Sequence, residues 1–223
     1  CATGHRPIGI KYMKKSFSSR GLLLGLVFFA GNAHPQLDES ERAIIDWVDA
    51  NTVAPIELLE NIVNIGSGTM NTAGVREVGN VLRAELDEVG LETEWIELPS
   101  EMNRAGHLVG KLDGTRGKKM LLIGHLDTVF EADDGFQAYS REGNIATGPG
   151  IDDMKSGDVV IVYALKALQA AGVLDGMQII AFYTGDEEFA GRPLSISRRD
   201  LIESGKWPHI SILKARMAHL YFC

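Results

Sequence analysis

The stretch MLLIGHLDTVF, residues 120–130, places a short apolar run directly before a turn that carries a histidine and an aspartate. Such a run, bounded by polar residues or glycine, is typical of a central β-strand that is covered on both faces. A second run at 177–183 follows a helical pattern at 154–171, whose apolar residues share one face. Strand, helix and strand in this order predict a βαβ unit and therefore an α/β sheet.

The residues upstream of this unit predict helices and one pair of strands. Apolar residues at helical spacing, with glycine at position 90 as a C-terminal cap, indicate three helices, and a fourth ends near residue 204. Two alternating segments separated by a polar stretch indicate a hairpin-like pair of strands. The helices are expected around 44–48, 56–63, 75–89 and 200–204, and the strands at 91–98 and 107–112.

Composition narrows the classes of function. The 223 residues carry a net charge of −8, which argues against a general nucleic-acid binder, because phosphate contacts need a surplus of lysine and arginine. An acidic, soluble enzyme fits this charge better. The two cysteines are Cys1 and Cys223, so the sequence offers neither a disulfide framework nor a cysteine-rich zinc module. A bound metal must therefore use histidine, aspartate and glutamate.

The beginning of the chain is predicted to be a targeting signal at residues 13–33. Lys14, Lys15 and Arg20 precede the apolar run 21–30, and small residues before His34 suit cleavage after Ala33. Export to the periplasm or the medium is expected, with no membrane association after cleavage. The run is shorter than a spanning helix, although a membrane anchor or a buried helix remains an alternative. Residues 1–12 precede Met13 and are interpreted as upstream or added sequence.

Three polar clusters each follow a predicted strand or open the predicted helix. In an open α/β sheet, ligands bind beyond the carboxyl ends of the strands, where these clusters are expected to meet. Histidine with aspartate, paired aspartates and paired glutamates at one such edge favour a metal or catalytic site over three unrelated solvated loops. The clusters are His125 with Asp127, Asp152 with Asp153, and Asp186 with Glu187 and Glu188.

The first two clusters each have two interpretations. Residues two apart in an extended segment point the same way, so the Asp127 carboxylate can accept the imidazole N–H of His125 and leave the other ring nitrogen for a metal. The alternative is a lone loop histidine beside a solvated aspartate. Asp152 and Asp153 either cap the helix or, through one carboxylate, bridge two metal ions, and Lys155 would lessen their repulsion.

Glu187 and Glu188 form the third cluster, directly after a predicted strand. Neighbouring side chains in an extended segment point to opposite sides, so one glutamate can bind a metal while the other faces a substrate. A solvated acidic loop is the alternative for this pair taken alone. The presence of all three clusters at strand ends favours the functional interpretation.

Three motifs resemble the successive motifs of the zinc carboxypeptidase and aminoacylase family, which includes glutamate carboxypeptidases, acetylornithine deacetylase and succinyl-diaminopimelate desuccinylase. They are GHLDTVF at 124–130, TGPGIDDMKSG at 147–157 and YTGDEEFAG at 183–191. The resemblance covers about 47–202, and the segments at 64–71 and 197–202 look most like the glutamate carboxypeptidase branch. It implies a zinc-exopeptidase-like catalytic domain over 34–205, with a central sheet flanked by helices on both faces.

The same resemblance implies a role for each matching residue. His125 would bind one zinc ion, Glu188 would bind a second, and Asp153 would bridge the two. Asp127 would orient His125, and Glu187 would act as the general base. The implied reaction is hydrolysis of an amide or peptide bond in a small peptide or an N-acyl amino acid. Relatives of this family dimerise through a smaller inserted domain.

The family pattern stops before the C-terminus. Relatives supply a further acidic ligand soon after the 200–204 helix, whereas residues 206–223 contain no aspartate or glutamate. This segment is therefore expected to be an aberrant tail, and the chain an N-terminal part that lacks the dimerisation domain. Each zinc ion would then keep two protein ligands where catalytic sites usually have three. A catalytically inactive fragment that keeps part of the fold and binds metal weakly is the alternative to an active hydrolase.

Overall fold

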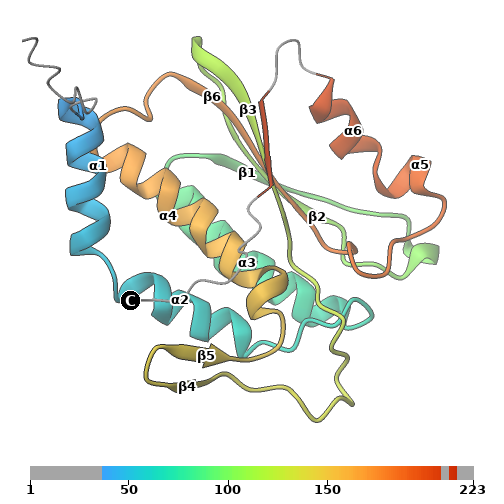
Figure 1. Cartoon of the computed structure of the whole chain (residues 1–223). Coiled ribbons are helices and arrows are strands. Elements are labelled where there is room, and N and C mark those ends of the chain that lie inside the picture. Colours follow the sequence, from blue (N-terminus) through green and yellow to red (C-terminus); the bar gives the residue numbers. More distant parts are fainter. Residues whose placement is uncertain (1–36, 207–210, 215–223) are drawn as a thin grey trace, which may run out of the picture. The chain divides into compact units, whose positions relative to one another are not determined.

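The computed structural model describes residues 37–206 and 211–214 (Figure 1). The predicted signal segment at 13–33 and the residues before it lie outside the described part. Among the described residues, no helix is both long and apolar enough to cross a membrane.

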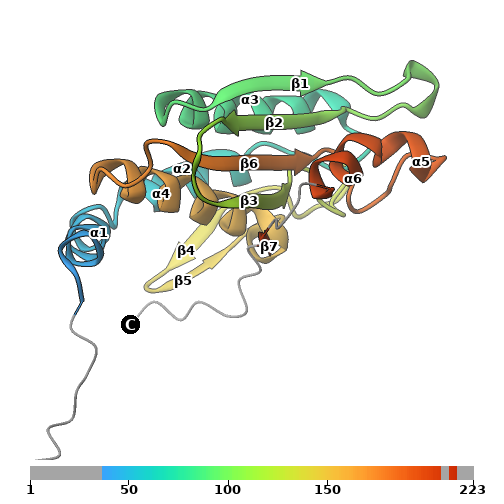
Figure 2. The same ribbon diagram turned by 90° about the horizontal axis from the view of Figure 1, so that it is seen from above.

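The core of the fold is a five-stranded sheet in the order β1-β2-β6-β3-β7 (Figure 2). β1 pairs with β2 and β2 with β6 in antiparallel fashion, while β3 lies parallel to both β6 and β7. The four predicted strands, including the hairpin-like pair, are confirmed as β1, β2, β3 and β6, whereas β7 was not predicted. The bounds of all five strands are Glu92–Ile96 for β1, His107–Leu112 for β2, Arg116–His125 for β3, Met177–Thr184 for β6 and Ser211–Lys214 for β7.

The predicted βαβ unit is present, because helix α4 connects the parallel neighbours β3 and β6. α4 spans Ser156–Ala170, close to the predicted 154–171. A small hairpin of β4 (Ser140–Glu142) and β5 (Ile145–Thr147) precedes it and was not predicted. Its two strands are three residues long and largely exposed, so they carry little alternation of apolar and polar residues.

The remaining helices cover the two faces of the sheet (Figures 1 and 2). On one face α2 and α3 pack with α4, and α1 contacts α4 from outside. On the other face lie α5 and α6, so the prediction of helices on both faces is confirmed. The bounds are Glu39–Ala50 for α1, Ala54–Val63 for α2, Thr72–Glu88 for α3, Leu194–Ser197 for α5 and Arg199–Gly205 for α6.

Alternation along the strands builds two apolar cores. Leu122 and Ala181 belong to the large core beneath α2, α3 and α4, whereas their neighbours Leu121 and Phe182 belong to a smaller core on the other face. Leu201 of α6 packs against this smaller core. Because both faces of the sheet pack against apolar side chains, the ends of the strands are fixed in position. The polar turns that follow these strands are therefore fixed in position as well.

Two details differ from the sequence predictions. Asp152 and Asp153 do not open the long helix but lie in a separate five-residue turn, η2 (Ile151–Lys155), in which Asp153 and Met154 leave helical geometry. The peptide bond between these last two residues is cis. The expected tail contributes β7 to the sheet, beside β3. Residues 207–210 and 215–223 lie outside the described part, so their aberrant origin stays a prediction.

Candidate metal centre

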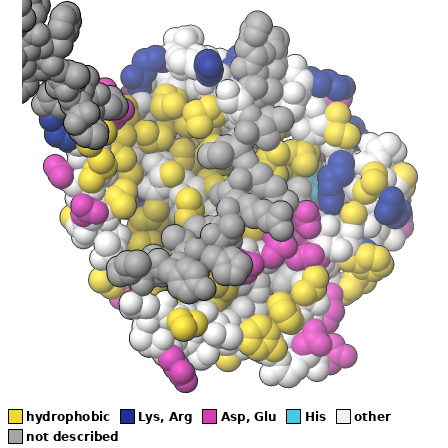
Figure 3. Space-filling model, in the orientation of Figure 1, with side chains coloured by type: hydrophobic (Ala, Val, Ile, Leu, Met, Phe, Trp, Pro, Cys, Tyr) yellow, Lys and Arg dark blue, Asp and Glu magenta, His cyan; other side chains and the backbone are white. Residues whose placement is uncertain are grey.

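Three side chains from different elements converge beyond the ends of β3 and β6. His125 ends β3, Asp153 lies in η2, and Glu188 lies in the turn after β6. One ligand atom from each lies within 4.8 Å of the other two, and Nε2 of His125 is 3.1 Å from Oδ1 of Asp153. In Figure 3, acidic side chains gather where β3 and β6 end. The structure therefore brings together the three residues predicted as metal ligands.

The three groups differ in exposure, and the cluster carries excess negative charge. The His125 side chain is 1% exposed, that of Asp153 is 70% exposed, and Glu188 is half-buried. Burial raises the pKa of Glu188, and the nearby carboxylates, Asp153 among them, raise it further against the opposing effect of His125. A group whose ionised form is disfavoured by its neighbours is one that a bound cation would stabilise.

The imidazole of His125 is surrounded by carboxylates. Burial lowers its pKa, but this effect is outweighed by hydrogen bonding with Asp127 and by the charges of Asp158 and Asp127, so that the pKa rises to about 9. In the absence of a metal, His125 is therefore protonated at neutral pH. A metal ion must displace that proton, because only the neutral imidazole has a free lone pair.

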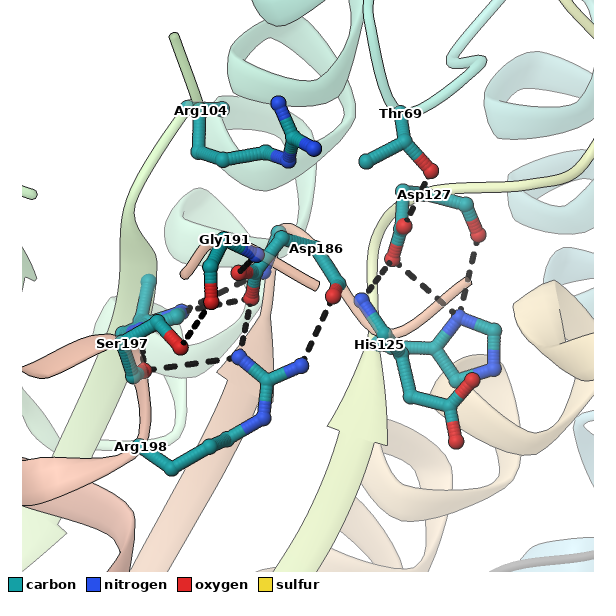
Figure 4. Close-up of polar contacts among 12 residues, drawn as sticks. Thr69, Arg104, His125, Asp127, Asp186, Gly191, Ser197 and Arg198 are labelled. Atoms are coloured by element: carbon teal, nitrogen blue, oxygen red, sulfur yellow. Dashed lines mark hydrogen bonds and ion pairs between the residues drawn. The ribbon is translucent and has the colours of Figure 1, made fainter. Parts of the chain in front are cut away.

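Asp127 faces the imidazole, as predicted, and its carboxylate also makes hydrogen bonds to other parts of the chain. Nδ1 of His125 lies 3.0 Å from the main-chain oxygen of Asp127 and 3.5 Å from its carboxylate. The buried carboxylate accepts hydrogen bonds from Thr69 Oγ1 at 2.6 Å, Glu187 N at 2.9 Å and Glu188 N at 3.0 Å. Asp127 thus joins the histidine to the backbone of the acidic turn (Figure 4).

Glu187 and Glu188 lie in different environments, although they follow the strand in a turn rather than in an extended segment. Glu187 is exposed and Glu188 is half-buried. Both line a cleft of about 500 Å³, and Glu188 also borders a second cleft of about 330 Å³. Glu188, which forms the candidate metal group together with His125 and Asp153, therefore lines both clefts. Asp152 lines the second cleft but lies outside the metal group.

The sequence suggested that Lys155 lessens the repulsion between Asp152 and Asp153. In the structure, its ammonium group binds elsewhere. Its side chain is buried and donates to the main-chain oxygens of Ile62 and Ile65, at 2.8 and 2.9 Å, which satisfies carbonyls at the end of α2. Burial lowers the pKa of Lys155 to about 8, although Asp158 acts in the opposite direction. Lys155 therefore stabilises the junction between α2 and η2.

Asp158 is a buried acidic group that the sequence analysis did not identify. It lies in the first turn of α4, fully buried, and burial raises its pKa well above the usual range. A β-carbon at position 124 would lie 2.2 Å from its carboxylate, so only glycine fits in the strand immediately before His125. Its position at the start of an apolar helix resembles ordinary helix capping, which left no distinct signal in the sequence.

Asp186 belongs to the third cluster in the sequence but not to the metal group. It is completely buried, and its carboxylate pairs with Arg198 and accepts a hydrogen bond from Gly191 N at 2.7 Å (Figure 4). The three consecutive acidic residues therefore face three different environments. Thr69 and Arg198, which the sequence analysis did not identify as parts of the site, hold this arrangement in place.

Comparison with known sequences gives a consistent assignment. Residues 121–220 match the family described as Peptidase family M20/M25/M40. Carboxypeptidase G2 from Pseudomonas sp. (strain RS-16) is 36% identical over 182 residues, which are 81% of this chain and 42% of that protein. A peptidase M20 domain-containing protein from Schizosaccharomyces pombe is 27% identical over 61% of this chain and 32% of that protein. The chain thus spans less than half the length of these curated relatives.

Solved structures share the fold. Human carnosine dipeptidase 1 superposes with a TM-score of 0.66 at 16% identity, covering 80% of this chain and 41% of that one. The di-peptidase Dug1p from Saccharomyces cerevisiae gives 0.62 at 16% identity over the same shares. The M20 family metallo-carboxypeptidase Sso-CP2 from Sulfolobus solfataricus gives 0.57 at 18% identity, covering 72% and 37%.

Proposed function

We propose that the chain belongs to peptidase family M20/M25/M40, whose family description matches residues 121–220, and that it forms part of the catalytic domain of a metal-dependent hydrolase of amide or peptide bonds. The observation that carries the proposal is the convergence of His125, Asp153 and Glu188, whose ligand atoms lie within 4.8 Å of one another. These residues come from three separate elements that meet at the ends of parallel strands, where α/β enzymes bind their ligands.

The donor set fits zinc. One imidazole nitrogen and two carboxylates are ligands that zinc accepts in catalytic sites. His125 and Glu188 would each bind one of two ions, and the outward-facing carboxylate of Asp153 would contact both. When bound, zinc supplies polarisation of the scissile carbonyl and acidification of a water molecule. The excess negative charge among these groups supports a cation at this position.

The residues around the metal group would divide the remaining tasks. Glu187, exposed in the cleft beside Glu188, would take a proton from the attacking water and deliver it to the leaving amine nitrogen. Proton transfer of this kind contributes about 10²–10⁴-fold to the rate. Asp127 would hold the turn that carries both glutamates through their backbone N–H groups, and it would keep His125 in its orientation.

The substrate is proposed to be a small peptide or an N-acyl amino acid. This rests on the 36% identity with a protein named Carboxypeptidase G2. The two clefts that meet at Glu188 would leave room for groups on either side of the scissile bond. Export to the periplasm or the medium is part of the same proposal and rests on the sequence pattern at 13–33.

Zinc binding by matched variants tests the proposal. The metal-free chain would be titrated with zinc in competition with a chromophoric chelator, and hydrolysis of an N-acyl glutamate would be followed in parallel. Asp153→Asn is expected to weaken zinc binding, whereas Asp152→Asn, its exposed neighbour outside the metal group, is the control and should not. Glu188→Gln should lower zinc content, and Glu187→Gln should keep the zinc and lose turnover.

The possible outcomes separate the two functions considered. Zinc binding with chelator-sensitive turnover supports the hydrolase. Weak zinc binding that depends on Asp153, without turnover, supports an inactive metal-binding fragment instead. Equal binding by the unaltered chain, Asp153→Asn and Glu188→Gln would contradict the metal site itself.

A further inference from the structure

The turn at residues 185–191 is held by side chains from elsewhere in the chain. The Asp127 carboxylate accepts the N–H groups of Glu187 and Glu188, and Nε of Arg104 donates to the main-chain oxygen of Phe189 at 2.7 Å. The guanidinium of Arg104 also lies over the Phe189 ring, 4.7 Å from its centre. The path of the turn therefore depends on contacts between distant residues rather than on a strand or a helix.

Asp186 anchors this turn to Arg198 in the segment that follows it. Arg198 donates through Nη1 to the Asp186 carboxylate and through Nη2 to the Asp186 main-chain oxygen, the latter at 2.7 Å. The carboxylate also accepts the N–H of Gly191 at 2.7 Å, which closes the turn on itself. Asp186 is completely buried, and the Arg198 side chain is 17% exposed. Figure 4 shows the contacts between the two residues.

His107 of β2 completes the surroundings of Asp186 without adding a charge. Its Nε2 donates to the main-chain oxygen of Ser197 at 2.7 Å, and its Nδ1 accepts the N–H of Gly185 at 3.4 Å. These two bonds suit a neutral ring. Burial lowers the pKa of His107 and outweighs the opposing effect of Asp186, 3.9 Å away. The guanidinium of Arg198 therefore supplies the positive charge that faces Asp186.

We propose that Arg198 is a positioning residue that, by pairing with Asp186, holds the turn where Glu188 can reach His125 and Asp153. Asp186 precedes Glu188 by two residues, so a rotation at Asp186 would carry the Glu188 carboxylate away from the other two ligand atoms. Without Arg198, the buried Asp186 carboxylate would lose its ion-pair partner, and the turn would open to hydrate it. The positioning role of Arg198 rests on the proposed metal site. The contacts by which Arg198 and Asp186 restrain the turn are present without a metal.

Hydrogen exchange of the metal-free chain tests the restraint directly. In Arg198→Ala the amides of Glu187, Glu188 and Gly191 are expected to exchange about tenfold to a hundredfold faster, as for the loss of a buried charged hydrogen bond. Amides in the centres of β3 and β6 should keep their rates. Arg199→Ala is the matched control, because the neighbouring Arg199 side chain is 63% exposed and pairs only loosely with Asp200 at 3.6 Å.

Asp186→Asn provides a second variant that keeps the size of the side chain, and it decides the question if Arg198→Ala does not fold. It should accelerate the same amides by a smaller factor. Equal exchange at these amides in both arginine variants and the unaltered chain would overturn the inference, as would uniform acceleration throughout the sheet, which indicates global destabilisation.

Zinc titration of the same proteins separates this inference from the proposed function. We expect Arg198→Ala to bind zinc about tenfold more weakly than Arg199→Ala, a loss typical of residues that support metal ligands. If the unaltered chain binds no zinc, the proposed function fails, and the exchange result still decides the restraint. If zinc binding is unchanged in Arg198→Ala although the amides exchange faster, the positioning role is refuted.

Discussion

Replacing Thr69 tests the hydrogen-bond arrangement around Asp127 without any metal. Thr69 is 2% exposed and donates its hydroxyl to the completely buried Asp127 carboxylate at 2.6 Å. Thr69→Val keeps the shape and removes the donor. A hydrogen bond to a charged group contributes about 1.5–3 kcal/mol, and because Asp127 keeps two backbone donors we expect a loss near 1.5–2 kcal/mol.

Thr69→Ser is the matched control, since it retains the hydroxyl and loses one methyl group, at a cost of about 0.8 kcal/mol. Urea unfolding followed by tryptophan fluorescence would give both free energies of unfolding. The valine variant should be the less stable of the two by about 1 kcal/mol. Equal stability of the two variants would show that the hydroxyl contributes nothing, and the reasoning about Asp127 would be refuted.

The pH dependence of the same difference is a second check. Burial raises the pKa of Asp127, but hydrogen bonds from His125 and Thr69 outweigh it and hold the pKa below 3.8. The stabilisation is therefore fully present above that pH and is lost as pH falls through the folded-state pKa. The gap between the unaltered chain and Thr69→Val should be largest near neutral pH and shrink only as pH falls through the folded-state pKa of Asp127. A gap that widens on acidification would contradict this assignment.

Two further predictions concern other parts of the chain. Lys155→Met should lower the free energy of unfolding in urea by about 1–3 kcal/mol, because two carbonyls at the end of α2 lose their donor. Lys166→Met, near the C-terminal end of α4, is the comparison variant. Because the pKa of Lys155 falls from 10.5 to about 8 on folding, the unaltered chain should gain stability from about pH 8 upward, and Lys155→Met should lack this gain. Export predicts a mature N-terminus at His34, and N-terminal sequencing of secreted protein that still carries Lys14 and Lys15 would reject cleavage.

Much of the fold could be predicted from local patterns. The apolar runs at 120–123 and 177–183 lie within β3 and β6, because the part of a strand that is covered on both faces is apolar on both faces. The periodic helix between them required a parallel connection, and so the parallel pairing of β3 with β6 followed. The β4–β5 hairpin left no such signal, because its exposed residues bury no continuous face.

The three residues of the candidate metal group could also be predicted from the sequence. His125, Asp153 and Glu188 were chosen from their motifs, and their closeness followed from the rule that parallel strands end at the same edge of a sheet. Their roles as ligands stay a prediction, since what the structure contributes is their proximity.

The tertiary structure alone decided how the acidic residues are held. Asp186, Glu187 and Glu188 are adjacent in sequence, yet one pairs with Arg198 and the other two present their N–H groups to Asp127, about 60 residues away. Lys155 likewise donates its hydrogen bonds to the main-chain oxygens of Ile62 and Ile65 and not to the aspartates beside it in the sequence. Periodicity reports which face of an element is buried, but a buried polar group takes whatever partner the packed chain brings within hydrogen-bond distance.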